Sequence, residues 1–363
     1  MLNKKSERSE KPEKIEKAEK KEKKIKQEEQ VEEEEIQFVN DADSEEERLK
    51  KEKKKKKKKK KDKDSDVKNK HYTLSIVIPS SIVDNAQSKE LRTYLVGQIA
   101  RTAGIFRVDE IIIFHDILNK KLDKDYISFF VTNLQYLETP QYLRKTLFPR
   151  SDDLVCSGLM NPLESSHHVR IDEWCPYREG CVLNRPVKKG EGSWVNIGLT
   201  KDCKIDTQLE DKTRVTVKLN ETAFDQRLKN YSGVAVSMED PKEHGLYWGY
   251  TVRVAETFKE IFDNSYYPEG YDFIIGTSDK GEDYLTADYQ AHKDFKHSLL
   301  FFGGLQGIEG MMESDEHFRS DEKTIFDLYL NTCLKQGLRT IRTEEAILIS
   351  LAVLKPKLDG VKD

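Results

Sequence analysis

Three glycine-bearing segments in the second half of the chain are suited to holding a small molecule. They are Ile275–Thr277, Phe302–Gly307 and Gln336–Thr343. Glycine at the end of a strand lets the backbone approach a ligand that a side chain would block, and ligands of open α/β sheets lie beyond the carboxyl ends of the strands. The phosphate-loop patterns GxxxxGK and GxGxxG are absent, which disfavours a nucleotide phosphate. The segments predict a site of backbone amides and carbonyls, suited to an adenosine cofactor, unless the glycines are ordinary turn residues.

The elements around these segments predict an α/β fold with a parallel sheet. Short apolar runs predict strands over 71–80, 108–115, 127–134, 271–277 and 299–302. Helical spacing of apolar residues predicts helices over 85–102, 140–147, 252–262 and 344–354. Thr343 precedes two acidic residues and is a candidate N-cap of the last helix.

A different pattern separates the two α/β stretches. Residues 153–250 contain scattered Gly and Pro and four or five short β-like runs, which predict a small β-barrel, with an OB-type barrel as first choice. The predicted domains are therefore a charged tail over 1–70, the first half of an α/β domain over 71–152, the β-barrel insertion over 153–250, and the second α/β half over 251–363.

The tail is almost wholly Lys, Glu and Asp and is predicted to be disordered, because it cannot bury enough apolar surface. Residues 1–70 carry 26 basic and 21 acidic side chains, a net of +5, so that the remaining chain carries −9 of the total −4. The lysine run Lys53–Lys61 could bind phosphates or a nuclear import receptor, or could be a solvated spacer. Five cysteines and no apolar run of about 20 residues predict a soluble, intracellular protein with no membrane partner.

Three motifs resemble the SPOUT class of RNA methyltransferases, in particular its archaeal and eukaryotic nuclear family with an inserted OB-like domain. Gln98–Ala103 (QIARTA) with Phe106–Ile113 (FRVDEIII) is similar to the first motif of SpoU-type members. Leu300–Glu309 (LFFGGLQGIE) looks like the second motif, and Gly337–Ala346 (GLRTIRTEEA) looks like the third. The resemblance covers about residues 71–363 and includes the place of the insertion.

The resemblance implies a trefoil-knotted α/β domain that binds S-adenosylmethionine, with an active site at a homodimer interface. It assigns Arg101 as the catalytic arginine, facing the cofactor from the partner subunit, and Glu309 as a group that accepts a hydrogen bond from substrate or caps a helix. The cofactor-binding residues that it implies are Ile275, Gly276, Thr277, Phe302, Gly303, Gly304, Leu305, Gly307, Gln336, Gly337, Leu338, Thr340, Ile341, Arg342 and Thr343.

The sequence departs from the SpoU-type pattern at three places. Leu95 stands where Asn is usual, Arg107 where Gly is usual, and Thr340–Arg342 where Ser-Leu-Asn is frequent. These departures leave two acceptors open, a ribose 2′-oxygen and a base nitrogen.

Basic and aromatic residues of the insertion predict an RNA-binding face, although a solvated charged surface around barrel-core aromatics would show the same composition. The candidate cations are Arg170, Arg178, Arg185, Lys188 and Lys189, beside Trp174, Tyr177 and Trp194. His167, His168, Cys175 and Cys181 are close in sequence, but Cys175 and Cys181 are not spaced like a zinc pair, and no metal is expected.

The resulting hypothesis is a nuclear, nucleolar RNA methyltransferase that uses S-adenosylmethionine on structured RNA, with ribosomal RNA as the favoured substrate. One alternative is a non-catalytic scaffold, associated with RNA, chromatin or the mitotic spindle, that retains the fold. Another is an OB-type RNA-binding module with an accessory α/β domain.

Overall fold

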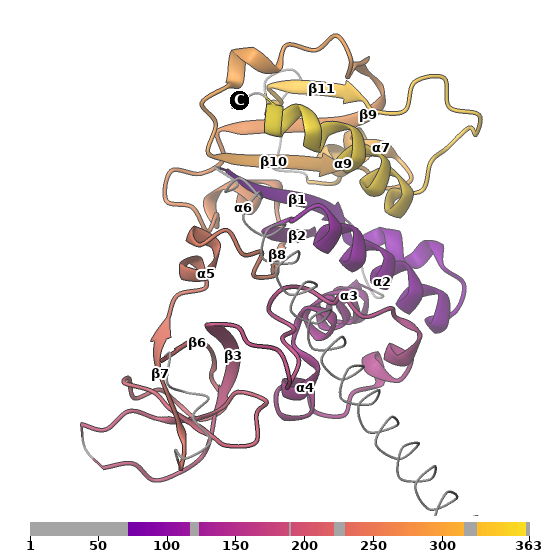
Figure 1. The fold of residues 1–363 in the computed structure, drawn as a ribbon. Helices are drawn as coiled ribbons and strands as arrows, with labels where there is room; N and C mark the ends of the chain where they lie inside the picture. The colour runs from indigo at the N-terminus through magenta and orange to yellow at the C-terminus, as the bar shows by residue number, and fades with distance from the viewer. Residues whose placement is uncertain (1–71, 117–122, 189, 221–228, 316–324, 361–363) are drawn as a thin grey trace, which may run out of the picture. The chain divides into compact units, whose positions relative to one another are not determined.

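The computed structural model describes residues 72–116, 123–188, 190–220, 229–315 and 325–360. Six parallel strands form one sheet in the order β11-β9-β10-β1-β2-β8 (Figure 1). The strands are β1 Thr73–Pro79, β2 Glu110–Phe114, β8 Thr251–Ala255, β9 Phe273–Asp283, β10 His297–Phe302 and β11 Leu328–Asn331. The central strands β1, β2 and β10 are mostly apolar and buried along almost their whole length, because helices cover both faces of the sheet.

The helices divide between the two faces. On one face α2 (Lys89–Ile105), α3 (Asp123–Glu138) and α9 (Thr343–Gly360) contribute to the larger apolar core. On the other, α6 (Phe258–Asp263) and α7 (Gly307–Ser314) pack over the alternate side chains of the strands. The remaining helical elements are η1 Ser80–Asn85, α4 Gln141–Leu147, η2 Asp152–Leu154, η3 Ser157–Leu159, α5 Glu239–Glu243 and η5 Tyr289–His292. None of the helices in the described ranges is long and apolar enough to span a bilayer.

A five-stranded closed barrel occupies the middle of the chain. Its strand order is β3-β4-β5-β7-β6, with β5 and β7 parallel and the other pairs antiparallel. The strands are β3 Tyr177–Val182, β4 Trp194–Asn196, β5 Cys203–Lys204, β6 Arg214–Leu219 and β7 Tyr231–Val236. A separate apolar core fills it. The sequence thus predicted a small β-barrel, and the strands between residues 177 and 236 form one, but β5 is only two residues long and had no detectable pattern.

Two predicted elements are wrong in type. Residues 127–134 were expected to be a strand and belong to helix α3, since Phe130, Asn133, Leu134 and Leu137 bury one helical face. Residues 127–134 contain several β-branched and aromatic side chains, which are typical of a strand, so their helical spacing was not recognised. Residues 252–262 were expected to be one helix, but form strand β8 followed by α6. The break lies at Thr257, whose side chain accepts a hydrogen bond from the Glu260 amide at 3.2 Å.

A buried polar network joins the barrel to helix α3. The Arg214 guanidinium donates to both carboxylate oxygens of Glu138 and, through Nε, to Glu179 at 2.6 Å. Glu179 also accepts from the Trp248 indole N–H at 2.6 Å. Glu138 and Glu179 are almost completely buried, so these hydrogen bonds offset the cost of removing both carboxylates from water.

Two adjacent histidines, His167 and His168, close this network. Their Nε2 atoms lie 2.7 Å and 2.6 Å from the Glu138 carbonyl oxygen. Burial, with the neighbouring His167 as a further cause, lowers the pKa of His168 to about 3. An unfolded histidine binds a proton below a pH of about 6.5. The contribution of the neutral His168 to the free energy of unfolding is therefore fully present above that pH. It declines as the pH falls, because only the unfolded chain takes up the proton.

A His168→Gln variant keeps an N–H donor for the Glu138 carbonyl. We expect the free energy of unfolding of this variant to depend less on pH than that of the wild type. Between pH 7 and pH 5 the wild type should lose about 2 kcal/mol more of its free energy of unfolding than the variant, as urea denaturation would measure. The same substitution at the half-buried His292 is the control. Equal pH dependence of the wild type and His168→Gln would contradict this account.

Candidate functional site

The candidate site lies at the edge of the sheet where the parallel strands end. The register places Thr277 of β9 beside Phe302 of β10, Val77 of β1 beside Phe301, and Phe114 of β2 beside Pro79. The residues that follow β10, β1 and β2 therefore leave the sheet at the same edge. This is the edge at which ligands of open α/β sheets bind.

The second glycine segment is a compact turn between β10 and α7. A Cβ atom on Gly303 would lie 2.4 Å from the carbonyl carbon of Gly307, and Gly307 has a φ of +74°. Both positions therefore require glycine for the turn itself. Phe302 is buried in the core, whereas Leu305 is 80% exposed at the tip. The segment thus combines an obligatory turn with an apolar side chain open to solvent.

The third segment is held to the second by Thr343. Its hydroxyl donates to the carbonyl oxygen of Gly303 at 2.8 Å, across forty residues of chain. Thr343 is therefore not the N-cap that was predicted. Instead, the amide of Arg342 donates to the carboxylate of Glu345 at 3.0 Å, half of a capping box, and Arg342 precedes the first helical residue.

The remaining residues of the third segment form an exposed loop after β11. Gln336 folds back on it, with its side-chain amide donating to the carbonyls of Leu338 and Arg339 at 3.0 and 3.3 Å. Gly337, Leu338 and Thr340 are exposed, and Ile341 is half-buried. Apart from its two chain neighbours, none of the residues that the structure describes has an atom within 4 Å of a Cβ built on Gly337, so these residues do not require glycine there.

The first segment differs from the prediction in one respect. Gly276 does not end a strand, because β9 continues to Asp283. A Cβ atom on Gly276 would lie 2.6 Å from the Tyr329 ring, so the glycine makes room for β11. Ile275 is buried in the core. Thr277 does reach the candidate site, since its hydroxyl donates to the Phe301 carbonyl at 2.7 Å.

Residues after β1 and β2 complete this edge and were missed from the sequence. Asp116 accepts hydrogen bonds from the Ser80 hydroxyl at 3.1 Å, the Ser81 amide at 2.9 Å and the Ser81 hydroxyl. A Cβ atom on Gly304 would lie 3.2 Å from Ser81 Oγ and 3.8 Å from Asp116 Oδ2. The polar pairs Ser80-Ser81 and His115-Asp116, each at the end of a predicted strand, were the signal that could have found them.

Glu309 lies on the first turn of α7, and its carboxylate is paired with Lys280 at 2.8 Å. Burial by itself would raise the pKa of Glu309, but the hydrogen bond and charge of Lys280 outweigh it and lower that pKa. Glu309 is thus an ionised acceptor with one cationic partner rather than a proton donor.

Arg101 lies on α2 and donates to the carbonyl of Pro162, on the segment that precedes the barrel. It belongs to a stripe on α2 in which Leu91, Tyr94, Gln98, Arg101 and Ile105 follow one another at steps of three or four residues. Leu91, Tyr94 and Ile105 are its exposed apolar side chains. Within one chain, Arg101 therefore lies in a partly exposed row of mostly apolar side chains.

The predicted RNA face is only partly available. Arg178 is fully buried and donates to the carbonyls of Ile197, Val169 and Arg170, so its assignment to a surface that contacts RNA is wrong. Arg170 and Lys188 are exposed, and Arg185 pairs with Asp202 at 2.6 Å beside the Trp194 ring. Lys189 lies outside the described residues, as do the tail and its lysine run. Over the described ranges, no three His, Cys, Asp or Glu residues gather in a way that could hold a metal ion.

Comparisons with known proteins agree with the motif resemblance. Residues 73–354 match the model of a protein family described as "Putative RNA methyltransferase". The chain is 48% identical to the mouse 28S rRNA (uridine-N(3))-methyltransferase over 307 residues, which cover 81% of this chain and 79% of the relative. It is also 48% identical to the human protein of that name, with 80% of each chain covered.

Among the solved structures that match is the SpoU methyltransferase AviRb from Streptomyces viridochromogenes in complex with the cofactor AdoMet. It covers 81% of this chain and 60% of that chain, with a TM-score of 0.32 and 9% sequence identity. This likeness is too weak to support an argument.

The Thr343 hydroxyl gives a direct test of the candidate site. Thr343→Val removes the donor to Gly303 at nearly constant volume, whereas Thr343→Ser keeps it. Loss of one hydrogen bond of about 1 kcal/mol should weaken binding of S-adenosylmethionine about fivefold in the valine variant. The serine variant should bind within about twofold of the wild type. Calorimetric titration measures both, and equal affinities for valine and serine would show that this contact does not shape the site.

Proposed function

Because the chain belongs to a family of SPOUT-class RNA methyltransferases, we propose that it transfers a methyl group from S-adenosylmethionine to N3 of a uridine in large-subunit ribosomal RNA. The observation that supports this most strongly is the match along almost the whole folded part of the chain to the mouse and human enzymes named for that reaction. The three departures from the SpoU-type motifs, at Leu95, Arg107 and Thr340–Arg342, are consistent with a base nitrogen rather than a ribose oxygen as acceptor.

The candidate site fits an adenosine-containing cofactor. Leu305 and Leu338 are 80% and 69% exposed on the second and third segments, and a flat apolar ring system would cover such side chains. Backbone around Gly303, Gly304 and Gly337 can supply amides and carbonyls without steric hindrance from side chains. Thr277 and Thr343, each bonded to a carbonyl of the β10 end, fix the spacing of the three segments. When bound, the cofactor supplies an electrophilic methyl group.

The chain must orient the uracil and deal with its N3 proton. The methyl group moves between two atoms that lie in line with it, the cofactor sulfur and the uracil nitrogen. The reaction therefore depends more on how the protein positions these atoms than on covalent chemistry by the protein. N3 is nucleophilic after its proton has passed to solvent water, and the N–C bond to the methyl group then forms as the sulfur–methyl bond breaks. A guanidinium near the uracil carbonyl oxygens stabilises the anion that loss of the proton leaves. We assign that role to Arg101. Glu309, ionised beside Lys280, can accept a hydrogen bond from the substrate or cofactor.

This assignment of Arg101 needs a second subunit. Arg101 lies on the exposed stripe of α2 with Leu91, Tyr94 and Ile105. An apolar row of this kind on a helix is typical of a surface that another protein covers. We therefore place a homodimer interface along α2, through which Arg101 of one subunit would reach the cofactor segments of the other.

The other parts of the proposal concern the insertion, the tail and the chain path. The barrel order 1-2-3-5-4, with closure between the first and fourth strands, supports an OB-type barrel inserted between residues 153 and 250. A trefoil knot would involve the C-terminal segment with the three cofactor segments. A ribosomal RNA substrate and the lysine run Lys53–Lys61 together favour a nuclear, nucleolar location reached through an import receptor.

Replacement of Arg101 tests the function. Arg101→Ala should lower methyl transfer to ribosomal RNA by about 100-fold or more, the size of the loss when a group that stabilises transition-state charge is removed. Its affinity for S-adenosylmethionine should stay within about threefold. Lys89→Ala, which removes a positive charge from the start of the same helix, is the control. The substrate is rRNA from cells that lack the protein; after incubation with enzyme and cofactor, its nucleosides are analysed by mass spectrometry. If the wild-type enzyme binds the cofactor but leaves this RNA unmethylated, the result favours the scaffold alternative.

The proposed dimer is tested on the same helix. Tyr94→Asp places a charge within the apolar stripe and should convert the protein to a monomer at micromolar concentration, because an unpaired charge in an apolar interface is costly. Leu285→Asp, at an exposed site after β9, should leave the mass unchanged. Light scattering coupled to gel filtration measures the mass, and a wild-type monomer would refute the shared site.

A further inference from the structure

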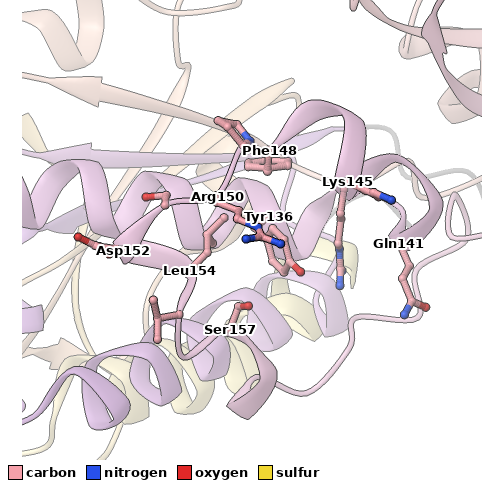
Figure 2. Close-up of a pocket in the computed structure, with 12 residues that line it drawn as sticks. Tyr136, Gln141, Lys145, Phe148, Arg150, Asp152, Leu154 and Ser157 are labelled. Carbon is pink, nitrogen blue, oxygen red and sulfur yellow. The ribbon is translucent and has the colours of Figure 1, made fainter.

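A pocket of about 600 Å³ opens between the end of α3, helix α4 and the segment that follows it (Figure 2). Residues from Tyr136 to Ser157 line it, and none of them belongs to the three cofactor segments. In Figure 2, Lys145 and Gln141 lie toward one end and Asp152 toward the other. This pocket has no role in the chemistry assigned above.

The pocket combines fixed aromatic rings with cations. Tyr136 and Phe148 are in edge-to-face contact, with ring centroids 5.4 Å apart. The Arg144 guanidinium lies 4.7 Å from the Tyr136 ring centroid and is held by the carbonyls of Leu137 and Thr139 at 3.0 and 2.9 Å. Burial lowers the pKa of Arg144, but an arginine remains protonated at neutral pH. The aromatic wall is therefore ordered before any ligand arrives.

The charge of the pocket is opposite to that of its surroundings. Arg144, Lys145 and Arg150 line it together with one carboxylate, Asp152, which gives a local charge of +2. The chain beyond residue 70 carries a net charge of −9. A concave cationic site on an acidic domain concentrates the attraction for anions at one place. Lys145 and Arg150 are exposed, so both can reach a phosphate.

The segment that forms one wall of the pocket continues to contacts with α2, the helix that carries Arg101. Its outer wall is tied to α3 by the Asn133 amide, which donates to the Asp153 carbonyl at 3.0 Å. Farther along the same segment, Met160 packs against Gly97 of α2, where an added Cβ would lie 3.0 Å from the Met160 side chain. The Pro162 carbonyl then accepts from Arg101. The segment thus runs from the pocket directly to the proposed catalytic arginine.

From these observations we infer that the pocket binds a single-stranded nucleotide of the substrate RNA that flanks the methylated base. Lys145 and Arg150 contact the two phosphates that flank this nucleotide, and its base lies against Tyr136 and Phe148. Aromatic rings beside cations are the usual means by which proteins bind unpaired nucleotides. The inference rests on the proposed function, because it assumes that the target base is presented near Arg101.

The test uses the full-length protein and a fluorescein-labelled decamer of uridine. Lys145→Ala/Arg150→Ala removes two exposed cations, and Lys259→Ala/Lys293→Ala is the charge-matched control at two exposed sites outside the pocket. We expect the pocket variant to raise the Kd for the decamer about tenfold and to reduce the salt slope by about 1.4, from about 0.7 for each lost phosphate contact. Both variants should bind S-adenosylmethionine as the wild type does.

A second measurement does not depend on the variants. A decamer that contains 4-thiouridine should crosslink on irradiation to peptides that contain Tyr136 or Phe148, as identified by mass spectrometry. Decamer affinity and salt slope equal to those of the control variant would overturn the inference, as would crosslinks confined to the barrel. The binding of a poly-glutamate peptide is measured with the same proteins. If the pocket variant alone lost affinity for this peptide while its RNA binding stayed unchanged, the inference would also be overturned. Failure of the wild type to methylate rRNA would instead count against the proposed function.

Discussion

The parallel pairing of β1 with β10 is the constraint on which the rest of the structure depends. Residues 73–77 pair in register with residues 297–301, across more than 200 residues of chain. The Thr73 hydroxyl and His297 Nδ1, 2.8 Å apart, mark the start of this register. The pairing places the end of β10 beside the end of β1, so that Gly304 lies against Ser81 and Asp116. A one-residue slip would turn the buried side chains of β10 to the opposite face and separate these groups.

The same pairing explains how a barrel can interrupt the domain without disturbing its sheet. The chain leaves the sheet after β2 and returns at β8, which is the neighbour of β2. The return is fixed at both ends, by the Thr251 amide on the Asp109 carbonyl and the His115 amide on the Ala255 carbonyl, each at 2.9 Å. Everything between these two strands is a crossover connection, and the buried Glu138–Arg214 pair attaches the barrel to it. Breaking such a buried pair typically costs about 3–5 kcal/mol, because it leaves a buried charge unpaired.

Much of the fold could be predicted because its central strands are mostly apolar runs. β1, β2 and β10 and helices α2, α4 and α9 have the expected type and nearly the expected positions. The errors fall where tertiary pairing decides local structure. Residues 127–134 have side chains that suit either a strand or a buried helix, and their packing against α2 and the sheet selects the helix. Strand β11 lies at the edge of the sheet and is only four residues long, so its sequence carried no pattern.

In the candidate site, too, some features could be predicted from the sequence and others could not. Glycine spacing and motif order indicated the cofactor segments, but could not separate glycines that the turn requires, Gly303 and Gly307, from one whose surroundings are open, Gly337. Composition placed Arg178 with the surface cations, whereas three backbone carbonyls hold it inside the structure. An arginine is buried when oxygens are arranged for its planar donors, and that arrangement arises only when segments distant in sequence meet. The accessible cations therefore had to be identified from the structure, and the pocket at Lys145 and Arg150 is one place where they lie beside aromatic rings.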